Sequence, residues 1–356
     1  MRILITGICG FTGSLMARPL QELDSGIEFW GIDNLLRTGG EQNRAPLRAS
    51  GIHLVHGDVR CRRDLDVVPA VQWVIDGAAN PSVLAGVTGD FSSLQLVEHN
   101  LLGTVNLLEF SRRTGAGLIL LSTSRVYSIG PLANLPVTVK NEAYRPQLDS
   151  YRVDGLSSEG VAENFPTTPP VSLYGATKLA SELLALEYGE AFGLPIWINR
   201  CGVLAGAGQL GTADQGIFAF WINSYLRRRP LSYIGFDGLG HQVRDCLHPR
   251  DLTALVLKQM RSAHQQVERV QNVSGGVASA MSLAQLSSWC AARFGKHTIR
   301  SDAGSRPYDV PWMVLDSARV KRQWDWQPTV RVDQILEEIT QHAEAHPEWL
   351  EISGCT

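Results

Sequence analysis

Apolar runs of strand length alternate with amphipathic stretches through the first 205 residues. The run 116–123 is apolar up to its last two residues, which is typical of a central strand covered on both faces. Six strands are predicted, at 2–6, 28–33, 52–58, 73–79, 116–123 and 195–201. Helices are predicted at 13–23, 98–114 and 173–192. This alternation predicts an α/β fold with a Rossmann-type, doubly wound parallel sheet.

Residues 129–171 interrupt the pattern, because they hold many prolines and polar residues and show little periodicity. A loop of this length inside a compact domain is usually functional, so we expect a lid or a substrate-binding insertion here. From residue 206 onward the pattern is mixed. Helices are predicted at 216–229 and 282–295, strands within 231–248, and two short helical stretches within 309–346.

Two domains are therefore expected. The first, over 1–205, contains the parallel sheet and the 129–171 insertion. The second, over 206–356, is a smaller α/β domain for substrate, with some segments returning to the sheet. A cleft between the two would be the natural place for a ligand.

Composition narrows the functional classes mainly by exclusion. The chain has 356 residues, of which 44% are apolar and 19% charged, with a formal net charge of −3. No long block of lysine and arginine is present, so no nucleic-acid partner is expected. No apolar run approaches the roughly 18 residues of a membrane span, and the N-terminus enters a glycine loop directly, unlike a signal peptide. Scattered cysteines and histidines without ligand spacing predict a cytoplasmic protein with reduced thiols and no metal.

The segment ILITGICGFTGSLMARPL places three glycines directly between the first strand and the first helix, at Gly7, Gly10 and Gly13. Such glycines permit a tight turn and let a pyrophosphate approach the backbone at a helix N-terminus. Asp33 ends the second strand 20 residues after Gly13. A carboxylate there can bind both ribose hydroxyls and repel a 2′-phosphate, so NAD is favoured over NADP. A plain turn for the glycines, and a loop cap for Asp33, remain the alternatives.

Further strand ends add small or polar residues where the cofactor would lie. HGDVR brings a carboxylate to a place where adenine could rest, and DGAAN brings small residues that let a dinucleotide lie close to the sheet edge. Routine turns explain either motif about equally well. Together with neighbours of the glycine loop and of the second strand, the expected cofactor contacts are Phe11, Asn34, Asp58, Val59, Ala78 and Ala79.

In SLYGATKLASELLALEYG, Tyr174 and Lys178 are four residues apart at a helix start, hence on one face. An ammonium beside a phenol lowers the phenol's pKa from about 10, and bound NAD⁺ would add positive charge. Tyr174 is therefore predicted to be a general base. The motif is weak alone and gains weight only from the dinucleotide pattern upstream.

Four motifs together, TGICGFTG, LSTSRVYS, YGATK and GHQVRDCLHPRDL, resemble the extended short-chain dehydrogenase/reductase superfamily of nucleotide-sugar epimerases and dehydratases. The resemblance implies that Tyr174 is the catalytic tyrosine and that Lys178 holds the nicotinamide ribose. It implies that Thr123 hydrogen-bonds the reacting sugar hydroxyl. It also implies that Asn100 lies near the cofactor and that Arg244 contacts the nucleotide diphosphate.

The residues after Thr123 separate the members of this superfamily. Sugar 4,6-dehydratases follow the threonine with Asp-Glu, whose carboxyl groups remove water, whereas this chain has Ser124 and Arg125. Arginine cannot act as a general acid at ordinary pH, so dehydration is disfavoured and redox-neutral inversion is expected. Ser122 is expected to bond the backbone.

The long step from Thr123 to Tyr174 and the segments after it most resemble the CDP-paratose 2-epimerase (CDP-tyvelose epimerase) branch. Val203 supports this, because 4-epimerases carry an asparagine at its position. The resemblance implies an isomerase that inverts C2 of a CDP-linked deoxyhexose through a transient ketone. NAD would be tightly bound and regenerated in each turnover.

Substrate contacts and assembly are less determined by the sequence. The candidates for substrate binding are Ser124, Gln215, Arg244 and Arg306. Ion pairing is the alternative for the arginines, with Asp245 as one possible partner of Arg244. A homodimer or homotetramer is expected, through helices near 92–114 and 173–192. A 4-epimerase or reductase of a UDP-, GDP- or dTDP-sugar, and a non-catalytic NAD-binding regulator, remain alternatives.

Overall fold

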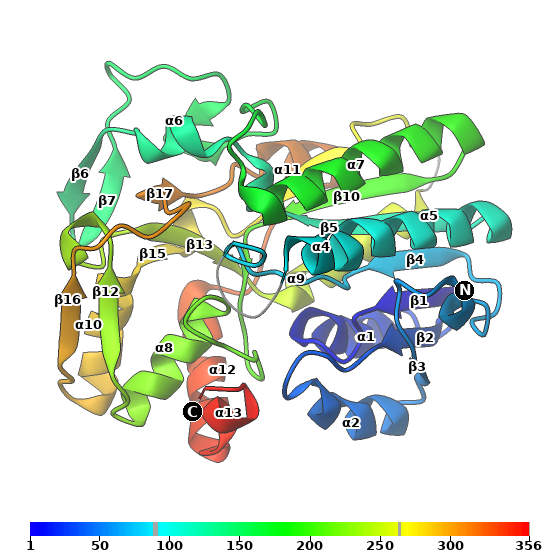
Figure 1. Cartoon of the computed structure of the whole chain (residues 1–356), viewed down its shortest axis with the longest axis horizontal. Coiled ribbons are helices and arrows are strands. Elements are labelled where there is room, and N and C mark those ends of the chain that lie inside the picture. The colour runs from blue at the N-terminus through cyan, green and yellow to red at the C-terminus, as the bar shows by residue number, and fades with distance from the viewer. Residues whose placement is uncertain (88–91, 263–264, 356) are drawn as a thin grey trace.

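A parallel sheet of seven strands forms the centre of the protein, in a computed structural model that describes residues 1–87, 92–262 and 265–355 (Figure 1). The strand order is β14-β10-β5-β4-β1-β2-β3, and the order reverses beside β1, which is the switch point of a Rossmann-type sheet. This confirms the predicted fold class. The strands are β1 (Arg2–Thr6), β2 (Glu28–Asp33), β3 (His53–His56), β4 (Trp73–Asp76), β5 (Gly117–Thr123), β10 (Ile196–Cys201) and β14 (Val270–Val273).

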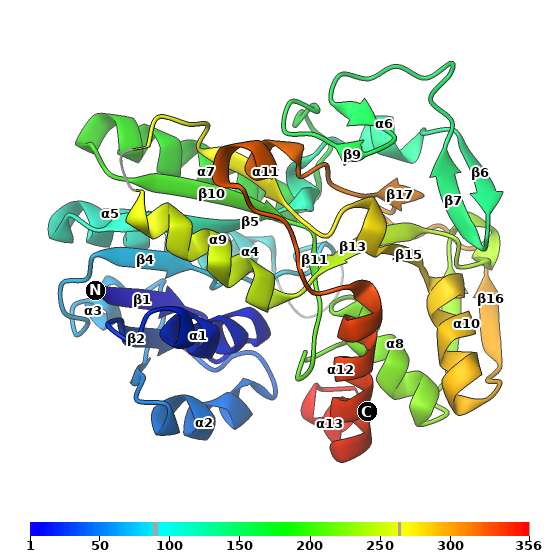
Figure 2. The ribbon, with the colours of Figure 1, turned by 180° about the vertical axis from the view of Figure 1, so that it is seen from behind.

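Helices cover both faces of this sheet. Alternate strand residues point to opposite sides, so Ile3 and Ile5 join one hydrophobic core whereas Leu4 joins the other. Figure 2 shows α9 and α11 in front of the sheet, and Figure 1 shows α5 and α7 on the opposite face. The first face carries α1 (Phe11–Leu23), α9 (Pro249–Arg261) and α11 (Ala318–Trp324). The second carries α5 (Gly103–Thr114) and α7 (Ser172–Phe192), and α4 (Ser93–Val97) packs against α7 through Leu96 and Tyr174.

The long helix predicted at 98–114 begins earlier than expected. Helix α4 starts after Ser92, whose side chain and that of Gln95 form a reciprocal capping box. A π-helical turn, η2 (Glu98–Leu102), then joins α4 to α5. Because a π turn shifts the side-chain register, the periodicity over this stretch predicts the helix but not its start.

Several elements were not predicted. Helix α9 and strand β14, which pairs with β10, complete the sheet from the C-terminal half. Two short helices, α2 (Arg44–Ala49) and α3 (Arg62–Leu65), precede and follow β3 in the chain. The predicted strands at 52–58 and 73–79 end earlier than expected, at His56 and Asp76. The four-residue elements carry too few residues to show a period, whereas α9, with 13 residues, is long enough to show one and was missed.

The C-terminal half builds a second core beside the sheet. Its sheet contains β11 (Val203–Leu204), β13 (Val243–Leu247), β15 (Ala280–Ser282) and β17 (Trp312–Met313), and β12 (Leu231–Ile234) pairs with β16 (Ile299–Asp302). The helices are α8 (Ile217–Leu226), α10 (Leu283–Phe294), α12 (Val332–Ala345) and α13 (Trp349–Ile352). Helix α12, with 14 residues, is longer than the short stretch predicted there.

The 129–171 insertion is more regular than its sequence suggested. It contains α6 (Ile129–Ala133), a hairpin of β6 (Val137–Lys140) and β7 (Ala143–Pro146), and a small hairpin of β8 (Leu156–Ser157) and β9 (Gly160–Val161). Both residues of the first turn, Asn141 and Glu142, have positive φ, as a two-residue hairpin requires. Backbone hydrogen bonds from Tyr144 to His241 (2.9 Å) and from Val161 to Val314 (2.8 Å) fix the insertion to the C-terminal half. Within the described residues, no helix is long and apolar enough to cross a membrane.

Candidate active site

The glycine loop lies at the carboxyl end of β1, against the end of β4. Gly7 has φ +64, and a Cβ atom there would lie 3.0 Å from the backbone of Ala78. A Cβ on Gly13 would lie 2.5 Å from the carbonyl oxygen of Gly7, so helix α1 can pack this closely only with glycine. Gly10 caps α1 without a side-chain hydrogen bond, which leaves the first N–H groups of the helix facing out of the loop beside Phe11.

Asp33 braces this loop. One carboxylate oxygen accepts a hydrogen bond from the backbone N–H of Cys9 (2.8 Å) and the other from Leu35 (2.8 Å). A carboxylate has about four lone-pair sites, so two remain for ribose hydroxyls. Asp33 therefore caps the loop, as the alternative interpretation of the sequence held, and still has two acceptor sites with which it could bind a ribose.

Asn34 and Asp58 are joined at the neighbouring strand end. The Asn34 amide donates to Asp58 (2.9 Å), and Arg60 binds the same carboxylate (2.7 Å). Although burial opposes it, these hydrogen bonds hold the pKa of Asp58 at about 2. Val59 is buried against Gly103 at the start of α5.

Asn100 ties the end of β4 to α7. Its side chain accepts from the backbone N–H of Asn80 (2.8 Å) and donates to the hydroxyl of Thr177 (3.2 Å). The backbone N–H of Ala78 donates to Thr6 (3.0 Å) at the start of the same loop, which continues through Ala79. Asn100 thus positions the loop that would border the cofactor.

Thr123 ends β5, and Tyr174 and Lys178 lie one turn apart at the start of α7, which packs against β5. Thr123 accepts a hydrogen bond from the backbone N–H of Arg125 (3.2 Å), and its side chain is near enough to Tyr174 to lower the pKa of that phenol. A Cβ on Gly175 would lie closer than 3.0 Å to the carbonyl oxygen of Arg125. Glycine at this position therefore allows the first turn of α7 to reach Thr123.

The charge around Tyr174 differs from the sequence prediction. Burial raises the pKa of Tyr174 above its usual value, and the Thr123 hydrogen bond and the positive charge of Arg125 oppose this rise. Burial outweighs these two effects, so the pKa of Tyr174 lies above its usual value in the protein without cofactor, not below it as the sequence predicted. The role of Lys178 in lowering it stays a prediction.

Lys178 interacts with two buried carboxylates. Burial lowers the pKa of the Lys178 ammonium, and Asp76 and Glu182 raise it. Asp76 accepts hydrogen bonds from Thr104 (2.7 Å) and Thr6 (3.1 Å). Sequence reasoning missed Asp76, although a lone carboxylate ending the apolar run WVID was the available signal.

A second missed group links the two catalytic elements. Ser122 donates to the carboxylate of Glu182, so its expected bond to the backbone is wrong. Arg200 binds Glu182 (2.7 Å), and it also donates to the hydroxyl of Tyr127 (3.2 Å). This buried network joins β5, α7 and β10 directly behind Thr123 and Lys178.

Three of the four substrate candidates, Ser124, Arg244 and Arg306, are near enough to Arg125 to adjoin it or act on its charge. Ser124 and Arg125 belong to a short 3₁₀ turn, η3 (Ser124–Val126), and the charges of Arg244 and Arg306 both act on Arg125. Arg244 binds Asp309 (2.6 Å) and Arg306 binds Asp214 (2.7 Å). The ion pair left open as the alternative for Arg244 therefore does form, but with Asp309 and not with Asp245, which accepts hydrogen bonds from Ser274 and Leu315. Gln215 accepts from Arg37 (3.2 Å).

Comparison with known proteins places this arrangement in a family. The model of the family described as "NAD dependent epimerase/dehydratase family" matches residues 3–274. The chain belongs to this family. The resemblance inferred from the four sequence motifs is thereby confirmed.

Individual members of the epimerase/dehydratase family match along nearly the whole chain. The CDP-paratose 2-epimerase of Salmonella typhi is 27% identical and covers 93% of this chain and 95% of its own length. The UDP-glucose 4-epimerase of Azospirillum brasilense is also 27% identical and covers 92% and 87%. The crystal structure of UDP-glucuronic acid 4-epimerase from Bacillus cereus, in complex with UDP-glucuronic acid and NAD, has a TM-score of 0.76 at 24% identity and covers 97% and 99%.

The family is NAD-dependent, and the residues of the glycine loop fit such a cofactor. A Cβ on Gly10 would lie 3.1 Å from the carbonyl oxygen of Gly7, so any larger residue would fill the cradle beside the α1 N-terminus. The carboxylate of Asp33 stands at the end of the adjacent strand with unused lone pairs. Within 1–87, 92–262 and 265–355, no group of His, Cys, Asp and Glu could hold a metal ion.

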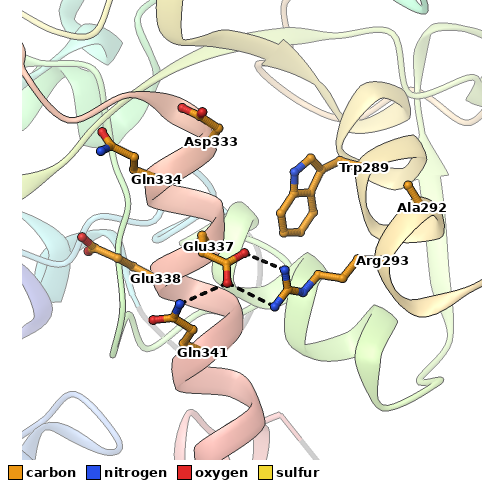
Figure 3. A pocket seen from close by; sticks show the side chains of 8 residues that line it. All are labelled: Trp289, Ala292, Arg293, Asp333, Gln334, Glu337, Glu338 and Gln341. Carbon is orange, nitrogen blue, oxygen red and sulfur yellow. Dashed lines mark hydrogen bonds and ion pairs between the residues drawn. The ribbon is translucent and has the colours of Figure 1, made fainter.

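A surface hollow between α10 and α12 lies apart from these residues (Figure 3). Arg293 reaches across it to Glu337 (2.6 Å), and Trp289 lines its α10 side. None of the predicted site residues lines this hollow.

Proposed function

We propose that this protein is an NAD-dependent nucleotide-sugar epimerase that inverts C2 of a CDP-linked deoxyhexose through a transient ketone. The observation that carries the proposal is the placement of Thr123, Tyr174 and Lys178 at the end of β5 and the start of α7. Ser124 and Arg125 follow Thr123 where a dehydratase would have carboxylates. Among the described residues, the side chains that act on Tyr174 are those of Thr123, Arg125 and Cys201, and none is a carboxylate.

In the proposed reaction, the Tyr174 phenolate accepts the proton of the sugar C2 hydroxyl while Thr123 hydrogen-bonds that oxygen. When bound, NAD would supply the acceptor for the C2 hydride and, once reduced, its donor to the other face of the ketone. The O–H and C–H bonds of C2 break as the carbonyl forms, and Tyr174 returns its proton in the reverse step. Lys178 would hold the nicotinamide ribose. Because the cofactor is regenerated, it is expected to stay bound between turnovers.

Arg244, Arg306, Gln215 and Ser124 are the proposed substrate contacts. The planar guanidinium group suits two phosphate oxygens, and two arginines could share the charge of a diphosphate. Each arginine already has a carboxylate partner, Asp309 or Asp214. A diphosphate would therefore bind against a partly neutralised pair of cations.

The match with CDP-paratose 2-epimerase along both chains supports C2 as the reacting carbon. The match of equal identity with UDP-glucose 4-epimerase favours inversion at C4 of a UDP-sugar as the second candidate. Neither candidate requires a carboxylate after Thr123. Both use Tyr174 as the base.

Domain roles and assembly follow as further proposals. Residues 1–205 would bind NAD and residues 206–356 mainly the substrate. The protein would act in the cytoplasm as a homodimer or homotetramer. Pairing through the helices on one sheet face is supported by exposed apolar side chains on α4, η2 and α7, namely Leu94, Val97, Leu102, Leu183 and Phe192.

Isotope labelling tests the proposal. CDP-paratose deuterated at C2 is incubated with the purified protein and followed by proton NMR and mass spectrometry, with UDP-glucose deuterated at C4 in parallel. Inversion at C2, slowed by the label and with the deuterium kept on the sugar, is the expected result. Inversion of UDP-glucose at C4 instead would transfer the assignment to the second candidate. No turnover of either sugar by protein that releases NAD on denaturation would contradict both.

A further inference from the structure

Gln242 carries a hydrogen-bond acceptor that nothing in the described part of the chain uses. The Nε2 of this side chain donates to the carbonyl oxygen of Ile234 (2.8 Å) and to one carboxylate oxygen of Asp309 (3.2 Å). Its Oε1 is buried and, among the described residues, has no hydrogen-bond partner. A buried acceptor without a partner costs free energy, so this oxygen is a candidate to bind a group that the chain itself does not supply.

The two partners of Gln242 determine which way its amide points. A carbonyl oxygen and an ionised carboxylate can only accept hydrogen bonds, so the NH₂ group of the amide must face both of them. Rotation of the amide by half a turn would instead place Oε1 against two acceptors. The unpaired oxygen is therefore held as an acceptor, and the group that it can bind must be a donor.

The position of this oxygen relates it to the proposed diphosphate site. Gln242 immediately precedes β13 and Arg244 is its second residue, so the two side chains leave the same face of the strand, about 7 Å apart along it. Asp309 binds both of them, because one of its oxygens accepts from Arg244 (2.6 Å) and the other from Gln242. A ribose of comparable length separates the diphosphate of a nucleotide from its base. The base of a nucleotide bound at Arg244 could therefore reach Gln242.

The chain segment beside Gln242 is strained. Phe236 and Asp237 have φ +46 and +63, which side-chain-bearing residues rarely adopt. Gly235 lies against the amide of Gln242, since a Cβ there would be 3.7 Å from its Nε2 and from the Asp309 carboxylate. Strain of this kind collects at ligand-binding segments. An unpaired acceptor and a strained segment thus occur at the same place.

We propose that Gln242 selects the nucleobase of the substrate, and that its Oε1 accepts a hydrogen bond from the 4-amino group of cytosine. Cytosine carries an amino donor where uracil and thymine carry a carbonyl acceptor. A carbonyl placed against Oε1 would leave two acceptors facing each other, both unpaired. Gln242 therefore favours a CDP-sugar over a UDP- or dTDP-sugar. This role rests on the proposed function for its class of substrate, a nucleotide sugar, and not on which carbon is inverted.

Titration of the wild-type protein with free nucleotides tests the hydrogen bond directly. The NAD-loaded protein is titrated calorimetrically with CDP, UDP and the 5′-diphosphate of 2-pyrimidinone riboside, which lacks the 4-amino group of cytosine and is otherwise of the same shape. The latter two are expected to bind about tenfold more weakly than CDP, because each leaves Oε1 unpaired. Binding of CDP no tighter than that of either one would overturn the proposal. This test needs no variant and so does not depend on how a substitution folds.

Substitutions then assign the preference to Gln242. Gln242→Met removes the acceptor with little change in size and is expected to bring the Kd values of CDP and UDP within about twofold of each other. Gln242→Lys replaces the acceptor by a donor and is expected to reverse the preference, in favour of UDP. An undiminished preference for CDP in Gln242→Met would overturn the proposal.

The matched control is Gln271→Met in β14, at the edge of the main sheet. The Nε2 of Gln271 also has partners, among them Gln323 (2.8 Å), and its Oε1 is likewise buried and unpaired within the described residues. Gln271→Met is expected to leave the ratio of the CDP and UDP affinities at its wild-type value. Loss of the preference in this variant as well would trace it to general loosening of the fold and would also overturn the proposal.

The isotope experiment separates this inference from the proposed function. Binding of CDP that is selective through Gln242, without inversion of the deuterated CDP-sugar at C2, would uphold the base selection and contradict the proposed reaction. Inversion at C2, with the same preference for CDP in Gln242→Met as in the wild type, would uphold the reaction and overturn the role of Gln242.

Discussion

Gly175→Ala is the substitution for which the structure and simple helix propensity predict opposite outcomes. Gly175 is the fourth residue of α7 and has no positive φ, so alanine alone would be expected to stabilise the helix by about 1 kcal/mol. A Cβ there would instead meet the carbonyl oxygen of Arg125 at a separation that real Cβ atoms essentially never show. The opposing atom belongs to the backbone and cannot turn aside.

The size of the effect follows from the required displacement. Ordinary contact begins at 3.4 Å, so the first turn of α7 must move by roughly 1 Å from η3, which carries Tyr174 away from Thr123. Overpacking of this kind costs about 1–3 kcal/mol, and a 1 Å error in a catalytic geometry can lower the rate by about 100-fold. We therefore expect a clearly lower melting temperature and a loss of turnover near 100-fold, with NAD content unchanged.

The control is Gly130→Ala in α6, where a new Cβ has no atom within 4 Å. It should leave both the melting temperature and turnover within error of the wild type or slightly raise the former. Thermal unfolding, released NAD and turnover of the accepted sugar are measured on both variants. A Gly175→Ala protein that is as stable and active as Gly130→Ala would refute the reasoning.

Three further predictions concern single carboxylates. Glu182→Gln leaves the buried Arg200 without its charged partner and should lower the free energy of unfolding by about 3–5 kcal/mol in urea titrations, whereas Glu22→Gln at the exposed Arg18 pair should have no measurable effect. The pKa of Asp58 is lowered from 3.8 to about 2 in the folded protein. Its contribution to the free energy of unfolding is therefore present at neutral pH and is lost as the pH falls from about 4 through 2. Asp58→Asn should lower the free energy of unfolding by about 1–2 kcal/mol at pH 7 and make it less dependent on pH between about 4 and 2. Asp33→Asn removes the charge expected to repel a 2′-phosphate, and should reduce the preference for NAD over NADP in titrations of the apoprotein; an unchanged preference would contradict the role of Asp33.

The strands and helices of the sheet domain were predictable from the sequence where their hydrophobic pattern is repetitive. The strand runs and the glycine loop are local, and each indicates its own structure before any partner is known. Strand β14, with four residues, has no such signal, because it is defined by pairing with β10. The hairpin of Asn141 and Glu142 was missed for a different reason: neither residue is glycine, yet both have positive φ.

The candidate site likewise contains residues that local sequence patterns identify and residues that only the fold brings together. Tyr174 and Lys178 are four apart on one helix, so their proximity follows from spacing alone. Asp76, Glu182 and Arg200 come from three separate elements, and only the packed sheet brings them behind Lys178. Which charge acts on which group depends on burial and on these long-range neighbours, and neither is visible in a motif.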